Sequence, residues 1–246
     1  MAGFGNERKQ VKKQGSKKLL AMSPEKLRTF SIQMHISGDI QKAEKGYLEF
    51  ISRGFNDPDI FSNLGLIYQE SGRVKKAQII YEKCISLFPN HPIANANLGY
   101  LYFSIGKLEE AEIAVQKAIK IDPNIANTYS TLGLILKEKG NLIEAEAQTR
   151  KAIELDCKSI DSYINLGLIL KALGDLDQAE LITKKAIEID PKSADAHLNL
   201  GTILQDQGRL KEAQVITKRA IEIDPTINDA HMNLGAILKD LGRIEE

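Results

Sequence analysis

The chain is poor in the residues that mark several other protein classes. It contains no tryptophan and only two cysteines, Cys84 and Cys157, among its 246 residues. Two cysteines without a pairing pattern exclude a disulfide scaffold, so we expect reduced, structural thiols and a cytoplasmic location. No apolar stretch is long enough to span a bilayer, which excludes a membrane-spanning helix from the expected fold. The formal net charge is zero, but the charges are unevenly placed.

The basic residues concentrate at the N-terminus. Residues 1–28 carry eight lysines and arginines against two glutamates. Because charged segments without apolar periodicity rarely fold, we interpret residues 1–23 as a disordered leader that aids solubility. The alternative is that this leader contacts an anionic partner such as lipid headgroups or nucleic acid. Ser23 and Pro24 then have the order of a helix N-cap and a first helical residue, which sets the domain boundary near residue 23.

After this leader, the dominant feature is a spacing of 34 residues, kept by three series without insertion or deletion. The first series is a leucine-glycine pair, found at Leu64, Gly65, Leu98, Gly99, Leu132, Gly133, Leu166, Gly167, Leu200, Gly201, Leu234 and Gly235. The second is a single glycine, found at Gly38, Gly72, Gly106, Gly140, Gly174, Gly208 and Gly242. The third is an alanine, found at Ala43, Ala77, Ala111, Ala145, Ala179 and Ala213. A fixed period in this range with helical patterning is typical of a stacked array made by tandem duplication.

Each period has the pattern of two helices. In residues 59–71 the apolar residues recur at spacings of three and four, as on one face of an α-helix. Gly72 ends this helix, since glycine suits the left-handed conformation at a helix C-terminus, and helical spacing restarts at Val74. Pro89 ends the second helix. The sequence therefore predicts antiparallel pairs of helices of about 14 residues, each about 21 Å long.

The glycines inside the predicted first helices indicate close packing. A glycine in a helix interior costs about 1 kcal/mol relative to alanine, so a compensating contact is expected at each one. We predict that Gly65 faces Ala77 on the second helix, which lets the two helices approach each other closely. Leu64 and Tyr68 are then expected to interlock beside this contact.

This pattern resembles the tetratricopeptide repeat. The defining positions are Phe61, Leu64, Gly65, Tyr68, Ala77, Tyr81 and Pro89. Later repeats keep the leucine-glycine pair and the alanine, while Thr149, Thr183 and Thr217 replace the second aromatic residue and Cys157 stands where proline is expected. The resemblance implies an all-α fold, a right-handed α-solenoid of tandem helix-turn-helix repeats. The repeats are expected at 24–57 (divergent), 58–91, 92–125, 126–159, 160–193, 194–227 and 228–246 (partial).

In proteins of this family the first helix of each pair lines the hollow side of the array. One position on that face is asparagine in nearly every repeat, namely Asn63, Asn97, Thr131, Asn165, Asn199 and Asn233. Because an asparagine amide both donates and accepts hydrogen bonds, this series is suited to hold the backbone of an extended peptide of any sequence. It resembles the asparagine ladder of O-linked N-acetylglucosamine transferases, which holds acceptor proteins. The alternative is that duplication has copied a solvated asparagine that binds nothing.

The remaining residues restrict the expected partner. Carboxylates at the ends of the first helices, among them Asp161, Asp195 and Glu138, favour neutral to basic peptides. The cations that would clamp an acidic C-terminal tail are lacking, since Ser62 and Ala96 stand on that face. The residues after the basic leader carry a net negative charge, and this charge together with the period of 34 argues against nucleic acid, including RNA, as a partner of the repeats. Because no spacing is typical of a catalytic or metal site, we predict a non-catalytic binding protein with no cofactor and no metal.

The last repeat lacks a second helix, because only four residues follow Gly242. A solenoid normally ends in a polar capping helix, so we expect Leu234, Ile237 and Leu238 to be partly uncovered and to favour self-association. We also expect a longer parent protein, since proteins similar to this one often continue into a glycosyltransferase. Two functions stay open: a scaffold that binds an extended polypeptide on its hollow side, or the substrate-recognition arm of a transferase whose catalytic domain lies outside this chain.

Overall fold

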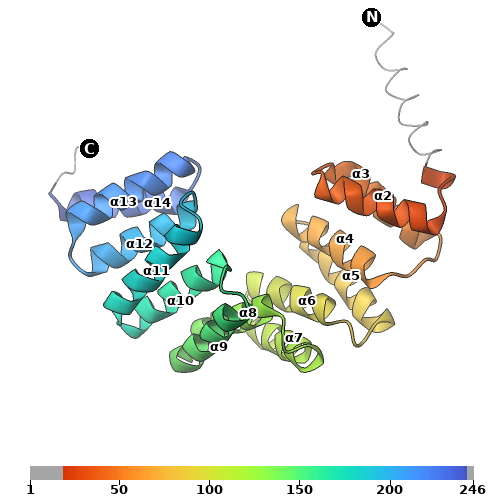
Figure 1. Cartoon of the computed structure of the whole chain (residues 1–246), viewed down its shortest axis with the longest axis horizontal. Helices are drawn as coiled ribbons and strands as arrows, with labels where there is room; N and C mark the ends of the chain where they lie inside the picture. The colour runs from red at the N-terminus through yellow and green to blue at the C-terminus, as the bar shows by residue number, and fades with distance from the viewer. Residues whose placement is uncertain (1–18, 243–246) are drawn as a thin grey trace, which may run out of the picture. The chain divides into compact units, whose positions relative to one another are not determined.

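The computed structural model describes residues 19–242, and every regular element in that range is an α-helix (Figure 1). The helices are α2 (Pro24–Ile36), α3 (Ile40–Ser52), α4 (Pro58–Glu70), α5 (Val74–Leu87), α6 (Pro92–Ser104), α7 (Leu108–Ile121), α8 (Ala126–Glu138), α9 (Leu142–Leu155), α10 (Ile160–Leu173), α11 (Leu176–Ile189), α12 (Ala194–Asp206), α13 (Leu210–Ile223) and α14 (Asn228–Asp240). Each has 13 or 14 residues, as the spacing predicts. The prediction of an all-α array of tandem helical hairpins is confirmed.

The chain divides into two compact units at the boundary between Lys107 and Leu108. We call the described residues up to Lys107 the N-terminal unit and those from Leu108 the C-terminal unit. The boundary falls between α6 and α7, the two helices that the repeat pattern assigns to residues 92–125. The uninterrupted spacing of 34 residues gives no sign of this division.

Local sequence determines where the helices start and stop. Ser23 caps α2, because its side chain accepts a hydrogen bond from the Lys26 backbone N–H, and Pro24 is the first helical residue, as expected. The turn glycines adopt the left-handed backbone conformation that other residues avoid, with φ of +70° at Gly72 and +81° at Gly174. This conformation recurs at the equivalent glycine of every repeat, so the predicted turn within each hairpin is confirmed.

The glycine of each leucine-glycine pair makes room for a side chain of the second helix. A β-carbon at Gly133 would collide with the Thr149 hydroxyl, and one at Gly65 would collide with the Tyr81 ring. The predicted partner of Gly65 was Ala77, which is buried but is not the group that fills the space. The correction follows from helix geometry, because the residue one turn after the alanine is larger and reaches into the gap.

The two ends of the array depart from this arrangement. In the divergent first repeat the glycine lies on the second helix and the side chain that fills its space lies on the first. Ser31 on α2 stands at the leucine-glycine position and fills the space left by Gly46 on α3. In the last repeat a β-carbon at Gly235 would meet no atom within 4 Å, and Leu234 is partly exposed. No second helix covers α14 within the described residues, which explains both observations. The expected partial exposure is wrong for Ile237 and Leu238, which are buried, and Ile237 packs against Leu200 and Leu204 of the preceding repeat.

Hairpins stack on each other within each unit. In the C-terminal unit one core cluster joins Leu166, Leu170 and Ala179 of one hairpin to Ile203 on α12, the first helix of the next repeat. The same arrangement recurs one repeat later, with Ile237 on α14 in the place of Ile203. In this unit α8, α10 and α12 each pack against their own second helix and against the first helix of a neighbouring repeat.

The N-terminal unit begins with a short anchored segment. The Arg53 guanidinium donates to the Leu19 and Met22 carbonyls at 2.6 and 2.8 Å. Arg28 on α2 bridges to Asp57 and Asp59 at 2.7 and 2.8 Å, which ties the first repeat to the second. The predicted basic leader lies mostly outside the described residues. None of the helices in residues 19–242 combines the length and the apolar character needed to cross a membrane.

Candidate peptide-binding surface

The predicted asparagine series ties neighbouring repeats together in the C-terminal unit. The Asn165 amide on α10 donates to Ser130 Oγ on α8 at 2.9 Å. The Asn199 amide on α12 donates to the Ile164 carbonyl on α10 at 3.2 Å. Each bond joins a first helix to the first helix of the preceding repeat. One of the two N–H groups of each amide is therefore already used within the fold.

Asn233 makes the most complete set of these contacts. Its amide donates to Gln205 Oε1 on α12 at 2.8 Å, and its Oδ1 accepts a hydrogen bond from Thr217 on α13 at 2.9 Å. One repeat earlier, the equivalent atoms Asn199 Oδ1 and Thr183 Oγ1 are both buried without a hydrogen-bond partner in the described residues. A hydrogen bond between these two atoms would be equivalent to the Asn233–Thr217 bond and would satisfy both. These asparagines are thus part of the packing between repeats.

The other members of the series differ from one another. Thr131 Oγ1 donates to the Asn127 carbonyl within its own helix, α8, at 2.9 Å. In the N-terminal unit, the Asn63 side chain hydrogen-bonds the Tyr47 hydroxyl, whose pKa burial raises to about 12. The Asn97 side chain on α6 is half-buried and forms no hydrogen bond with any residue of the described range. Asn97 therefore keeps both its donor and its acceptor groups for a ligand.

Exposed aromatic and aliphatic side chains surround Asn97 on α6. The Tyr100 side chain is 46% exposed, and its ring centroid lies 6.3 Å from that of Phe103. Ile93, one turn before Asn97, is also exposed. These residues were not predicted from the sequence, although the sequence contains a signal for them. Tyr100 stands at the repeat position that Leu66 occupies one repeat earlier, and it is the only aromatic residue at that position.

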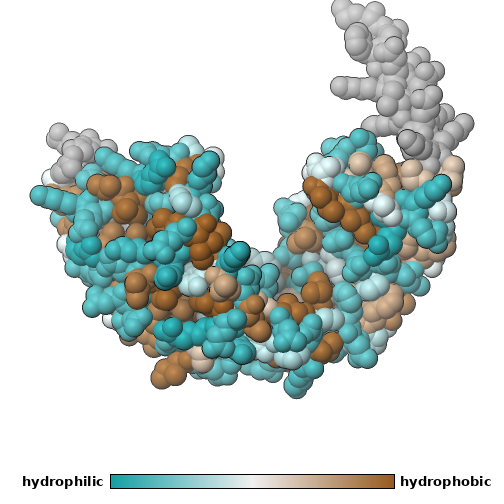
Figure 2. Space-filling view, in the orientation of Figure 1, coloured by the Kyte–Doolittle hydropathy of each residue, from teal (hydrophilic) through white to brown (hydrophobic). Residues whose placement is uncertain are grey.

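In the C-terminal unit, the first helices present apolar side chains at the centre of their face and a charge pair at one end. Ile164 and Leu198 are half-buried, and Met232 is 73% exposed. At the C-terminal ends of the first helices, Lys171 pairs with Asp206 of the next repeat at 3.2 Å. Figure 2 shows apolar surface among hydrophilic surface in the part of the molecule built from α8 to α14. The carboxylates predicted at the ends of the first helices are therefore partly neutralised by a neighbouring lysine.

The histidines and cysteines do not form a reactive site. His197 is buried and its Nδ1 lies 2.8 Å from the Ser193 carbonyl, as expected for a packing residue. His231 is the equivalent residue of the last repeat, but it is exposed, and its Nε2 lies 3.0 Å from the Pro225 carbonyl. Burial raises the pKa of the Cys84 thiol to about 11, while Cys157 is exposed. In residues 19–242 no three potential metal ligands gather in one place.

Family comparison matches the repeats directly. Three sequence models, each of a tetratricopeptide repeat, match residues 58–124, 114–147 and 170–232, which together make up more than half of the chain. No curated protein matches the chain. The defining positions from Phe61 to Pro89 lie inside the range 58–124, whereas Leu166 and Leu234 of the later leucine-glycine pairs lie outside all three ranges.

Solved structures with the same fold are numerous. A thermophilic TPR protein of Thermus thermophilus, TTC0263, is 21% identical with a TM-score of 0.67, over 74% of this chain and 100% of that one. A TPR protein of Parabacteroides merdae is 20% identical with a TM-score of 0.71, over 90% of this chain and 88% of that one. YrrB, a TPR protein described as having an unusual peptide-binding site, is 22% identical with a TM-score of 0.54, over 76% and 96%. At these identities the likeness establishes the fold alone.

Proposed function

Because the chain belongs to the tetratricopeptide repeat family, we propose that it is a non-catalytic scaffold that binds an extended polypeptide along the first helices of its repeats. Proteins with this fold generally mediate protein–protein interaction. The observation that best supports a binding site is the unpaired Asn97 amide beside the exposed Tyr100 on α6.

The chemistry of this part of α6 suits an extended peptide. The Asn97 side chain can accept from one backbone N–H and donate to one backbone C=O of a passing strand, which requires no particular sequence. Tyr100 and Phe103 offer ring faces and edges on which an apolar side chain of the ligand can pack. Stacked helical repeats present such elongated surfaces because each repeat contributes one helix to the same face.

The tied asparagines play a lesser part in this proposal. Asn165, Asn199 and Asn233 each use one N–H for a neighbouring repeat, so each has fewer groups left for a ligand than Asn97 has. We therefore expect Asn97 to contribute more to peptide affinity than any single asparagine of the C-terminal unit. The carboxylates near the ends of the first helices favour neutral to basic peptides.

The test compares two asparagines of the same register. Peptides are selected from a random library on the immobilised wild-type chain and then titrated by fluorescence anisotropy against Asn97→Ala and Asn165→Ala. Loss of two backbone hydrogen bonds should weaken binding to Asn97→Ala by about fivefold to a hundredfold. Equal affinity for the wild type and Asn97→Ala would refute the role of Asn97. Failure to select any peptide would refute the scaffold itself.

The transferase-arm alternative uses the same face and adds a catalytic domain outside this chain. It rests on the asparagine series and on the expectation of a longer parent protein, and three members of that series are engaged in contacts between repeats. The coding sequence that follows Glu246 in the gene distinguishes the two functions, since only the alternative requires a transferase domain there.

A further inference from the structure

A hollow of about 400 Å³ opens between α11, α12 and α13 of the C-terminal unit. Its apolar lining comes from Leu200 and Leu204 on α12 and from Val215 and Ile216 on α13. Val215 is 65% exposed, so the apolar lining reaches the surface. The volume is within the range of small ligand pockets and is large enough for a leucine or phenylalanine side chain.

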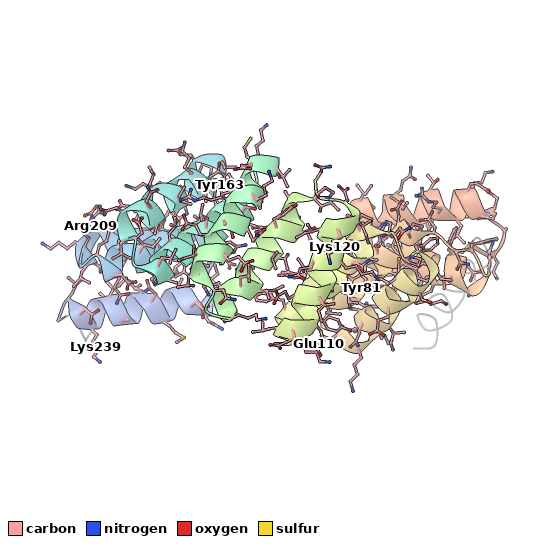
Figure 3. All side chains as sticks on the ribbon, turned by 90° about the horizontal axis from the view of Figure 1, so that it is seen from below. Tyr81, Glu110, Lys120, Tyr163, Arg209 and Lys239 are labelled. Atoms are coloured by element: carbon pink, nitrogen blue, oxygen red, sulfur yellow. The ribbon has the colours of Figure 1, made fainter. Side chains whose placement is uncertain are left out.

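Charged side chains from two helices and a turn surround this hollow. Arg209 pairs with Glu180 on α11 and with Glu212 on α13, each at 2.6 Å. Glu180 also pairs with Lys184 at 2.6 Å, so both carboxylates are already neutralised by cations. Lys211 is exposed and has no ion-pair partner in the described part of the chain. Figure 3 shows Arg209 at the outer end of this unit, apart from Lys239 on α14.

The preceding repeat offers an internal comparison for this hollow. The apolar lining is the same there, because Leu166, Leu170, Leu181 and Ile182 occupy the positions of Leu200, Leu204, Val215 and Ile216. The rim differs in charge, because Asp175 stands in the place of Arg209 and Asp177 in the place of Lys211. Gln178 also stands in the place of Glu212, so these three changes take the rim from one cation and three carboxylates to three cations and two carboxylates.

We propose that this hollow is a second protein-docking site, which takes a leucine or phenylalanine side chain from an acidic segment of a partner protein. The apolar lining receives the side chain, while Lys211 and Arg209 attract the carboxylates on either side of it. This charge preference is opposite to the one proposed for the first-helix surface. The Asn97 site lies on α6 and the hollow lies between α11, α12 and α13, so this proposal does not rest on the scaffold proposal.

The test uses the full chain and a dye-labelled peptide, Gly-Asp-Glu-Leu-Phe-Asp-Glu-Gly, titrated by fluorescence anisotropy. One control peptide has lysine in place of every acid, and a second has serine in place of the leucine and phenylalanine. We expect only the first peptide to bind, with an affinity that falls as salt is raised. The double variant Arg209→Asp/Lys211→Asp should bind it about tenfold more weakly, or worse.

The preceding repeat indicates that these variants can fold. Asp175 caps α11, where its carboxylate accepts from the Gln178 backbone N–H at 3.2 Å, whereas Arg209 makes no such cap on α13. The double variant therefore introduces residues that a neighbouring helix start already accepts. Lys211→Asp alone removes no ion pair, so an affinity loss in that variant cannot be attributed to unfolding.

Several outcomes would overturn the proposal. Equal binding of the acidic and basic peptides, or unchanged affinity in both variants, would show that the rim does not select charge. Binding of the serine peptide would show that the hollow is not used. Concentration-dependent dimerisation that Lys211→Asp abolishes would assign the surface to a second copy, and binding to phosphatidylglycerol vesicles in place of the peptide would assign it to lipid. Asn97→Ala should leave this binding unchanged, which separates the two proposals.

Discussion

Replacing Gly133 with alanine is a direct test of how the hairpins pack. A β-carbon at this position would collide with Thr149 Oγ1 and would lie 3.2 Å from the Ala145 carbonyl oxygen on α9. Thr149 is fully buried, and its hydroxyl is held by a 2.9 Å hydrogen bond to that same carbonyl. Neither group can move without shifting α9 or breaking the bond.

The expected free-energy change has two opposing parts. Alanine is favoured over glycine in a helix interior by about 1 kcal/mol. Overpacking of a filled core costs about 1–3 kcal/mol, and loss of the buried hydrogen bond adds about 1–3 kcal/mol. We therefore expect Gly133→Ala to lower the free energy of unfolding by about 1–5 kcal/mol. The substitution Thr149→Ala should remove most of this penalty, which gives a coupling energy above about 1 kcal/mol.

Gly235 is the matched control, since it has the same register and a β-carbon there would meet no atom within 4 Å. Gly235→Ala should gain the helix propensity alone and stabilise the chain by up to about 1 kcal/mol. Urea unfolding followed by circular dichroism, with amide exchange of α8 and α9 to localise the effect, measures both variants. If Gly133→Ala proves as stable as Gly235→Ala, the close contact does not limit packing and the reasoning fails.

Two further predictions concern polar contacts. From the sequence alone, replacing Asn165, Asn199 and Asn233 together with alanine is expected to leave the thermal midpoint unchanged. The structure predicts a lower midpoint, because each hydrogen bond between repeats contributes about 0.5–1.5 kcal/mol. An unchanged midpoint would count against these bonds. Lys184, then Gln207 and Arg209, hold the pKa of the Glu180 carboxyl below 4.5, so its contribution to stability is present above the unfolded pKa and is lost as the pH falls through the lower folded value. The thermal midpoint should therefore fall less in Glu180→Gln than in the wild type between about pH 5 and about pH 3, and parallel decreases would contradict the assignment.

The helical hairpins could be predicted because their signals are local. Apolar residues at helical spacing and a glycine with positive φ, such as Gly72, act within one turn of the chain. The partner of Gly65 is less local, because it depends on how far a side chain on the facing helix reaches, and Tyr81 reaches further than Ala77. The division at Lys107 and Leu108 left no trace in the spacing, since a repeat period records register and not how strongly neighbours pack.

For the candidate site, the sequence predicted only which repeat position it occupies. The asparagine positions were found from their spacing, but the partners of Asn165 and Asn199 lie 35 residues away on another helix, which a comparison of equivalent positions does not reveal. Asn97 differs from them because no such partner holds its amide. Tyr100 does not follow from the repeat pattern, because that pattern consists of what the repeats share and no other repeat has an aromatic residue at this position.

Differences between repeats are therefore the better guide to where this chain binds. The packing requirements of two adjacent repeats are nearly the same, as their identical leucines at 166 and 200 and at 170 and 204 indicate. Packing alone does not require Arg209 and Lys211 in place of Asp175 and Asp177, and Arg209 forgoes a helix cap that is typically worth about 1 kcal/mol. Its ion pairs with Glu180 and Glu212 offset part of that cost, but they give no reason for the unpaired Lys211 beside an exposed Val215. An acidic partner with one apolar side chain accounts for the cations and the hollow together.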